Sequence, residues 1–441
     1  MIFLIHSETA TNSIAANLGL SEYSYYFVLK EFRPVLEEFG LVLPVSDPAN
    51  EVDRIWANAA SHGEEALFLT FSPPHKTYCA ARCPTIPVFA WEFDTLPSEV
   101  WDSNPHHDWR HVLRRTGRAI THSQFSVETV LQAMGPDYPV VSAPAPVWDR
   151  FAGLYRNRPQ DRTPVKSARL KVRGRVFDSR QIDFAPLRPA ALRQHAAMLP
   201  PLRGGAEHDQ EILLDGVVYT SVFCPSDGRK NWFDMICAFV WCFREVEDAT
   251  LVLKLTKRNA DTEVLDILKD LAKLPPFRCR VVILDAFLDD DAYMGLAAAS
   301  TYAVNSSHGE GQCLPLMEYM SAGKPAVAPA HTSMADYIRP DNGFIVASHL
   351  EPASWPHDPR QAFRTRRHRI DFESLVAAYG DSYRVAKAEP QRYRHMGDNA
   401  FETLRGHCSA DRLRRIIRDF VIPAAGPAAT VDPVLCEMVA N

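Results

Sequence analysis

The sequence lacks any long hydrophobic run. Among its 441 residues, no apolar stretch reaches the roughly 18 residues that a membrane-spanning helix needs. The first five residues form a short apolar run with no basic residues before it, so we expect a first strand there and not a secretion signal. The composition, 46% hydrophobic and 23% charged, is typical of globular proteins. At roughly 100–200 residues per domain, the length predicts two or three domains.

The chain also lacks an excess of positive charge and a paired set of cysteines. Its 48 Lys and Arg against 54 Asp and Glu give a net charge of −6, which argues against a dedicated nucleic-acid binder. The nine cysteines are scattered and odd in number, which predicts reduced thiols in a cytoplasm. Cys79 and Cys83 have C-x3-C spacing, but no second pair stands at zinc spacing. We therefore expect two small buried side chains there and no metal.

Short apolar runs alternate with helical patterns in both halves of the chain. The expected strands are 2–6, 66–70, 88–91, 119–121 and 140–142 in the first half, and 217–223, 251–255, 281–284, 302–305 and 326–328 in the second. Expected helices lie between them, and two more follow at 372–387 and 398–420. This repetition predicts parallel sheets covered on both faces. The fold class is therefore α/β, with two Rossmann-like, doubly wound domains over 1–150 and 213–397.

A basic, proline-rich stretch separates the two halves. Residues 151–203 contain twelve Lys and Arg and three acids, a net charge of +9. One interpretation is a solvated insert or linker over 151–212. The other is a basic surface for an anionic lipid or a phosphate-bearing acceptor, with peripheral contact at the inner face of a membrane. The last residues, 424–441, are rich in Pro and Ala, and we expect a frayed tail.

The most informative segment runs from Val304 to Ala328. Its pattern predicts a buried strand, a loop with two glycines, a helix that Pro315 begins and Gly323 ends, and a new strand. The loop 309–314 then lies at the carboxyl end of a strand, against a helix N-terminus. Doubly wound sheets bind ligands in that place, and the backbone N–H groups there favour a phosphate.

Two glutamates stand in this segment, Glu310 in the loop and Glu318 in the helix. A carboxylate beside a phosphate is unfavourable, so we expect both to accept hydrogen bonds from hydroxyl groups. Two such carboxylates around an anion site suggest a diphosphate between two polyols. A nucleotide sugar has that shape.

The segment resembles the E-x7-E signature of retaining glycosyltransferases with the GT-B fold, glycosyltransferase family 4. The residues in register are Ser307, Glu310, Gly311, Leu314, Pro315, Glu318, Met320, Gly323, Pro325, Val327 and Ala328. The chain departs from the family pattern at Gln312, Cys313 and Tyr319, where Phe, Gly and Ala are usual. The resemblance implies a catalytic Glu310, a Glu318 that contacts the nucleotide ribose, and a donor pocket walled by Gly309, Gly311, Gln312, Cys313 and Leu314.

The resemblance extends upstream of this segment. Arg229 and Lys230, in a loop after the first strand of the second half, look like the family's pair of cations that hold the donor diphosphate. Lys254 ends the next strand and is a further donor-site candidate. Phe287 lies in a stretch that resembles the family's contact to the nucleotide base.

The first half is similar to the family's acceptor domain more loosely. Gly19 lies in a stretch that resembles the loop over the donor phosphates. His122, at a strand end, is a candidate for a polar contact to donor or acceptor, with Glu92 and Asp94 as alternatives. The run 289–291 of three aspartates resembles a metal motif, but it stands just before an expected helix. We therefore expect capping there and no metal.

The resemblance implies transfer of a sugar from a nucleotide sugar, a GDP- or UDP-sugar, with retention of anomeric configuration and without a metal or other cofactor. It implies a glycan, glycolipid or protein as acceptor, in bacterial polysaccharide biosynthesis or a related process. It also implies a C-terminal helix over 398–423 that crosses back to the first domain. Two alternatives stay open, a nucleotide-sugar epimerase of the same fold and a non-catalytic GT-B scaffold subunit.

Overall fold

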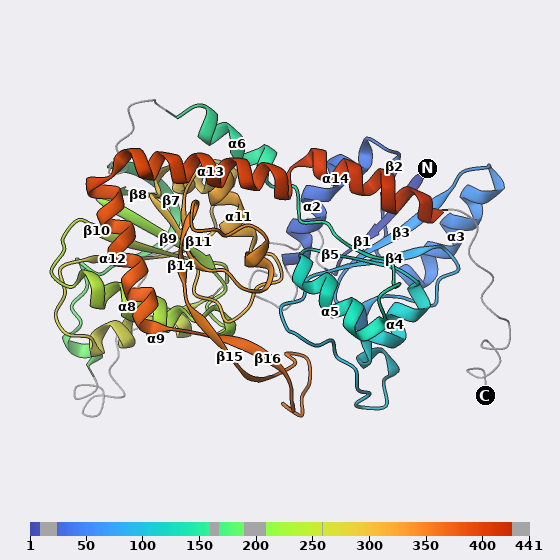
Figure 1. Cartoon of the computed structure of the whole chain (residues 1–441), viewed down its shortest axis with the longest axis horizontal. Helices are drawn as coiled ribbons and strands as arrows, with labels where there is room; N and C mark the ends of the chain where they lie inside the picture. Colours follow the sequence, from blue (N-terminus) through green and yellow to red (C-terminus); the bar gives the residue numbers. More distant parts are fainter. Residues whose placement is uncertain (9–23, 159–166, 189–208, 258, 426–441) are drawn as a thin grey trace.

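Two twisted sheets organise the chain and form the two lobes in Figure 1. The computed structural model describes residues 1–8, 24–158, 167–188, 209–257 and 259–425. The first sheet is entirely parallel, in the order β2-β1-β3-β4-β5-β6. Its strands are β1 (Ile2–His6), β2 (Leu41–Pro44), β3 (Ala66–Phe71), β4 (Thr85–Phe89), β5 (Ala119–Thr121) and β6 (Val140–Ser142). Its helices are α2 (Ser24–Glu37), α3 (Pro48–Ser61), α4 (Trp109–Thr116) and α5 (Gln124–Met134).

The second sheet has the order β14-β13-β12-β9-β10-β11-β7-β8. Its parallel strands are β9 (Val217–Phe223), β10 (Ala249–Leu255), β11 (Arg280–Ala286), β12 (Tyr302–Val304), β13 (Ala326–Pro329) and β14 (Gly343–Val346). The helices between them are α8 (Trp232–Phe243), α9 (Asp261–Lys273), α10 (Asp290–Ala299) and α11 (Leu314–Ser321). Each strand expected in this half is present, because buried parallel strands are continuous apolar runs that periodicity finds easily.

Two strands lie inside the stretch expected to be a linker. β7 (Ala168–Asp178) and β8 (Asp209–Leu214) form an antiparallel pair at the edge of the second sheet. Leu170 and Val172 are buried, while Arg169, Lys171 and Arg173, which alternate with them, are exposed. The alternation of buried apolar and exposed basic residues was not recognised as a strand, because the basic composition suggested a linker. A helix, α6 (Trp148–Arg156), also crosses the expected domain end at residue 150, and its Phe151 is fully buried.

Four of the eight described Lys and Arg residues of 151–203 form ion pairs, and they are Arg158, Arg169, Arg175 and Arg180. Arg169 binds Glu211 at 2.6 Å, and Arg175 binds Asp261 and Asp285. Residues 159–166 and 189–208 lie outside the described part of the chain. Among the residues described, no helix has the length and apolar character needed to cross a membrane.

The C-terminal helices join the two lobes along one side (Figure 1). The crossing is made by α13 (Pro390–Cys408) and α14 (Ala410–Ile416), while the preceding helix, α12 (Phe372–Ala388), packs on the second lobe (Figure 1). The single helix expected over 398–420 is instead broken at Ser409, whose side chain caps α14. The indole of Trp148 donates to the Phe401 carbonyl at 3.0 Å, and Arg414 binds Glu38 of the first lobe at 2.7 Å.

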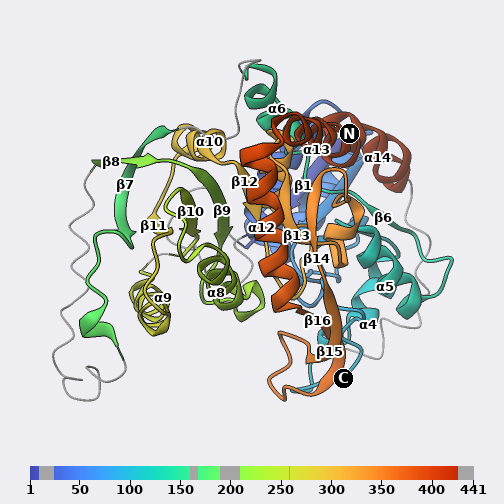
Figure 2. The same cartoon turned by 60° about the vertical axis from the view of Figure 1, so that its left-hand side comes forward.

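A hairpin joins the lobes on the opposite side (Figures 1 and 2). It consists of β15 (Ser348–Ser354) and β16 (Phe363–Ile370), paired antiparallel. Asp94 of the first lobe accepts hydrogen bonds from the Thr365 hydroxyl and the Arg366 backbone, both at 2.9 Å. The hairpin was not predicted, because its Pro- and His-rich sequence has little strand periodicity. Contacts with the first lobe stabilise it instead.

Candidate active site

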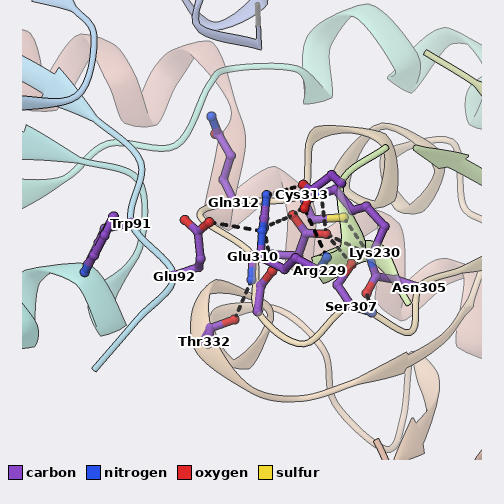
Figure 3. A network of polar contacts seen from close by, with 12 residues as sticks. Trp91, Glu92, Arg229, Lys230, Asn305, Ser307, Glu310, Gln312, Cys313 and Thr332 are labelled. Carbon is purple, nitrogen blue, oxygen red and sulfur yellow. Dashed lines mark hydrogen bonds and ion pairs between the residues drawn. The ribbon is translucent and has the colours of Figure 1, made fainter. Parts of the chain in front are cut away.

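The loop between β12 and α11 carries a buried carboxylate, Glu310, which is 4% exposed. Its two oxygens lie 2.8 and 2.9 Å from the Lys230 ammonium. Oε1 also accepts from the Ser307 hydroxyl at 2.5 Å and the Asn305 amide at 3.2 Å, and Oε2 lies 3.4 Å from Arg229 (Figure 3). Burial alone raises the pKa of such a carboxyl, but the two cations outweigh it and lower the pKa of Glu310 to about 2.

The backbone of the same loop is also fixed. The Glu310 N–H donates to the Thr332 hydroxyl at 3.0 Å. Cys313, the N-cap residue just before α11, has a left-handed backbone, φ 59°, and its sulfur accepts from the Asn305 amide at 3.2 Å. The loop therefore holds a charged carboxylate at the N-terminus of a helix through contacts on both sides.

Arg229 and Lys230 come from the loop after β9, as expected, and this loop meets the one that carries Glu310. The short 3-10 turn Gly228–Lys230 is capped by Asp227, and Asn231 begins α8 with φ 49°. The Arg229 guanidinium donates to the Gly309 carbonyl at 2.6 Å and to Asp227 at 2.9 Å. The structure thus brings the two sequence motifs together at the carboxyl edge of the second sheet.

The first lobe also contributes a carboxylate to this site. Glu92 lies 3.1 Å from Nε of Arg229, which therefore has three carboxylate neighbours, Glu92, Asp227 and Glu310. Burial raises the pKa of Glu92, and Arg229 offsets part of that effect. Glu92 was an alternative in the sequence analysis, and it is the first-lobe residue that meets the motif. The sequence gives no indication that Glu92 pairs with Arg229, because the pairing depends on how the two lobes face each other.

The two glycines of the loop allow the lobes to approach closely. A Cβ on Gly311 would lie 2.6 Å from the Ala90 side chain, and one on Gly309 would lie 3.0 Å from the Glu92 carbonyl. Next to them, the Gln312 side chain accepts from the Ala145 N–H at 3.1 Å. These three residues, expected to wall the donor pocket, contact the first lobe in this structure.

Glu318 lies in a different cluster from Glu310. It accepts from the Tyr293 hydroxyl of α10 at 2.6 Å. Arg150 is close enough to lower its pKa, but burial dominates and raises the pKa of Glu318 to about 7. Arg150 itself binds Glu31 of α2 at 3.1 Å and Asp290 of α10 at 2.7 Å. This second cluster was not predicted, because its members come from four helices far apart in the sequence.

The remaining candidates are placed less centrally. Lys254 is 6% exposed and donates to the Leu255 carbonyl at 2.8 Å; burial lowers its pKa to about 8. Phe287 follows β11 and is 56% exposed. Leu314 begins α11 and is half-buried. Gly19 lies outside the described residues.

His122 directly follows β5 and is fully buried. Its Nδ1 pairs with the Ala143 carbonyl at 2.8 Å, and burial lowers its pKa to about 4. None of the contacts of Glu310, Arg229 or Lys230 described above involves it. Its position suits a neutral structural histidine, and the polar contact to donor or acceptor, as part of the catalytic site, stays a prediction.

The aspartates of 289–291 cap and pair as their position indicates. Asp289 accepts from the Ala292 N–H at 2.8 Å and so caps α10, and Asp290 binds Arg150. In the described ranges, no three His, Cys, Asp or Glu side chains gather as metal ligands do. Cys79 and Cys83 are both buried, and none of the eight cysteines of those ranges forms a disulfide bond.

The arrangement of Arg229, Lys230 and the loop before α11 can bind an anion and stabilise negative charge. Two cations and the N–H groups of a helix start face the same loop, in a region largely closed to water. Donors fixed in this way stabilise negative charge that develops on a leaving group, because they need no rearrangement when the charge appears.

The sequence matches no model of a known protein family, and a comparison with curated proteins finds no match. Solved structures do share the architecture over almost the whole chain. HepE of Anabaena, in complex with UDP and glucose, has TM-score 0.52 at 13% identity, covering 95% of this chain and 99% of its own. A glycosyltransferase from Rickettsia africae has TM-score 0.54 at 10% identity, covering 97% and 99%.

A third similar structure is sucrose-phosphate synthase from Thermosynechococcus elongatus, with TM-score 0.52 at 13% identity, covering 96% of this chain and 100% of its own. At such identities the likeness is one of fold. The two lobes each hold an α/β sheet, the first wholly parallel and the second parallel apart from its edge pair β7–β8. With the crossing C-terminal helices and the likeness to these proteins over almost the whole chain, this is the GT-B fold, and the predicted fold class is confirmed.

Proposed function

We propose that this protein is a glycosyltransferase that takes a sugar from a nucleotide-sugar donor, with a UDP-sugar as the first candidate. The observation that carries the proposal is the meeting of Arg229, Lys230 and Glu310 at the carboxyl edge of the second sheet. A similar fold, that of HepE, has been solved with UDP and glucose, which supports UDP over GDP as the first nucleotide to test.

In this proposal, Arg229 and Lys230 bind the donor diphosphate. The bond between the anomeric carbon and the phosphate oxygen breaks, and both cations stabilise the charge that collects on the departing phosphate. An acceptor hydroxyl forms the new glycosidic bond from the same face of the sugar, and its proton passes to the departing phosphate oxygen. Configuration is thus retained. The two cations supply the positive charge that a metal would supply in other transferases, so we propose that no metal is needed.

Charge balance gives Glu92 a specific part in this reaction. Arg229 and Lys230 carry two positive charges, whereas Glu92, Asp227 and Glu310 carry three negative ones when ionised. A diphosphate is repelled by that balance. Since Glu92 belongs to the first lobe, a movement of the lobes can withdraw it from Arg229. We propose that the donor enters as Glu92 leaves.

The acceptor is proposed to be a glycan, a glycolipid or a protein. Glu318 is proposed to contact the nucleotide ribose. Contact of 151–203 with an anionic membrane is proposed from the basic composition of that stretch, and a cytoplasmic location from the nine scattered cysteines.

The test is a binding panel of UDP-, GDP-, ADP- and dTDP-glucose by calorimetry and thermal shift, with and without a chelator. A ligand at 100 times its dissociation constant adds about 2.7 kcal/mol to the free energy of unfolding, which a thermal shift detects. We expect one nucleotide class to bind the wild type, and to bind equally with the chelator present.

The variant Lys230→Met should bind that nucleotide at least about tenfold more weakly, because a phosphate contact is lost. Lys273→Ala, an exposed lysine of α9, is the matched control. If no nucleotide sugar binds the wild type, or if both variants bind like the wild type, the proposal is wrong.

A further inference from the structure

A groove lies between the hairpin and the first lobe, outside the site described so far. It has a volume of about 560 Å³. Its lining includes Asp94, Thr95, Gln132, Phe363, Arg364 and Arg366. That volume is within the range of roughly 300–1,000 Å³ found for small-molecule sites. We call it the hairpin groove.

The chemistry of the hairpin groove is that of a site for neutral, hydroxyl-rich rings. Phe363 offers a ring that is 73% exposed and lines the groove, so one of its faces is open to a ligand. Arg364 and Arg366 each bind a carboxylate through Nε, at 2.6 and 2.5 Å. Their terminal nitrogens make no hydrogen bond within the described part of the chain, so those donors are available to a ligand.

The charges around the hairpin groove balance. Arg366 is matched by Asp94, Arg364 by Glu99, and Arg360 by Glu99 and Asp358. Three guanidinium groups and three carboxylates leave no net field to attract an ion. Planar polar groups next to an exposed ring suit a sugar, whose hydroxyls bond to the first and whose apolar face stacks on the second.

Both walls of the hairpin groove lead to the candidate active site. On the first lobe, Asp94 is two residues from Glu92, so their Cα atoms lie at most about 7 Å apart. On the hairpin, Arg366 is two residues from His368, whose N–H donates to the His308 carbonyl at 2.9 Å. The His308 N–H in turn donates to the Arg229 carbonyl at 2.8 Å. A chain of sugars lying in the groove can therefore end beside Arg229 and Glu310.

We infer that the hairpin groove binds the saccharide part of the acceptor, a neutral oligosaccharide that stacks on Phe363 and bonds to Gln132, Arg364 and Arg366. This inference rests on the proposed function, and it makes the hairpin the element that selects the acceptor. Both lobes contribute to the groove, so the acceptor site is complete only when the hairpin lies against Asp94 and Thr95.

The experiment is saturation-transfer NMR on the full chain with a fixed panel: maltotetraose, cellotetraose, tetra-N-acetylchitotetraose and, as the charged comparison, tetragalacturonate. We expect at least one neutral tetrasaccharide to receive saturation from the wild type. Phe363→Ala should weaken its binding about tenfold, the equivalent of about 1.4 kcal/mol. Gln132→Ala should weaken it in the same direction.

Trp241→Ala is the matched control, because Trp241 is a 63% exposed aromatic on α8 that does not line the hairpin groove. The Kd for UDP is measured on every variant by calorimetry. An unchanged Kd for UDP together with lost saccharide binding supports the inference.

The inference is overturned if no neutral tetrasaccharide binds, if tetragalacturonate binds more tightly than all of them, or if Phe363→Ala behaves like Trp241→Ala. Failure of the proposed function appears separately, as an absence of UDP-sugar binding, whatever the tetrasaccharides do.

Discussion

Glu310 and Glu318 are eight residues apart on one loop and helix, yet their surroundings act on them in opposite directions. Both are withdrawn from water, which by itself raises the pKa of a carboxyl. Glu310 has Lys230 and Arg229 in direct contact, and its pKa falls to about 2. Glu318 has a tyrosine hydroxyl in contact and a shared arginine nearby, and its pKa rises to about 7. Whether a buried carboxyl stays charged is therefore decided by the cations that touch it.

The largest effect is expected from Glu310→Ala. The variant leaves the half-buried Lys230 without its carboxylate and takes one partner from Arg229; breaking a fully buried pair destabilises a protein by about 3–5 kcal/mol, which is the upper bound here. We expect sugar transfer to be abolished and the melting temperature to fall, measured by a transfer assay and calorimetry. Glu318→Ala is the comparison, and transfer by Glu310→Ala at the wild-type rate would end the assignment.

Lys230→Met tests the same contact from the cation's side. If Lys230 stabilises the departing phosphate, its loss should lower kcat by about 100- to 1,000-fold, the usual effect of removing one such donor. It should also raise the pKa of Glu310, because one of the two cations is gone. The pH dependence of unfolding reports this change in pKa: the acid limb of the Lys230→Met curve should lie at higher pH than that of the wild type. An unmoved limb would mean that Arg229 alone holds Glu310 charged.

Glu92→Gln addresses the carboxylate that the first lobe contributes. Removing its charge leaves Arg229 with one competitor fewer, so UDP should bind about tenfold more tightly. Calorimetry measures the Kd, and Glu99→Gln, another acid of the first lobe paired with an arginine, is the control. Weaker UDP binding in Glu92→Gln would show that Glu92 assists the donor and does not compete with it.

The smallest effect on stability is expected from Glu318→Gln, and it takes the form of a changed dependence on pH. The folded pKa of Glu318, about 7, lies above the ordinary carboxyl value of 4.5, so the folded state holds a proton that the unfolded state releases. Between pH 4.5 and 7 the folded state therefore loses stability as the pH rises. Glu318→Gln removes this loss and should gain at least about 1 kcal/mol relative to wild type between pH 5 and pH 8.

The pKa shift of Glu310 has the opposite sign to that of Glu318. Its folded pKa is depressed, so its contribution to stability is present above pH 4.5 and is lost as the pH falls towards 2. Urea unfolding curves at pH 3, 5 and 8 for the wild type, Glu310→Gln and Glu318→Gln separate the two carboxyls. A Glu318→Gln variant with the same pH dependence as the wild type would contradict the raised pKa.

The sequence was informative where a function depends on local order along the chain. Strand ends, glycine loops and helix starts placed Glu310, Arg229 and Lys230 at one sheet edge, and the structure brings them within contact although 80 residues separate Lys230 from Glu310. Parallel sheets make this possible, because all their strands end at the same edge. The edge pair β7–β8 escaped prediction because its Lys and Arg residues masked a half-buried alternation.

By itself, the sequence determined the two α/β units and the residues at the carboxyl edge of the second, because buried strands and capped helices leave periodic marks in a short stretch of chain. Only the tertiary structure decided that Glu92 meets Arg229, that Glu318 is separated from Glu310, and that the hairpin reaches Thr95 from Arg364, 269 residues away. Such contacts depend on how the two lobes face each other, and no local pattern encodes that orientation.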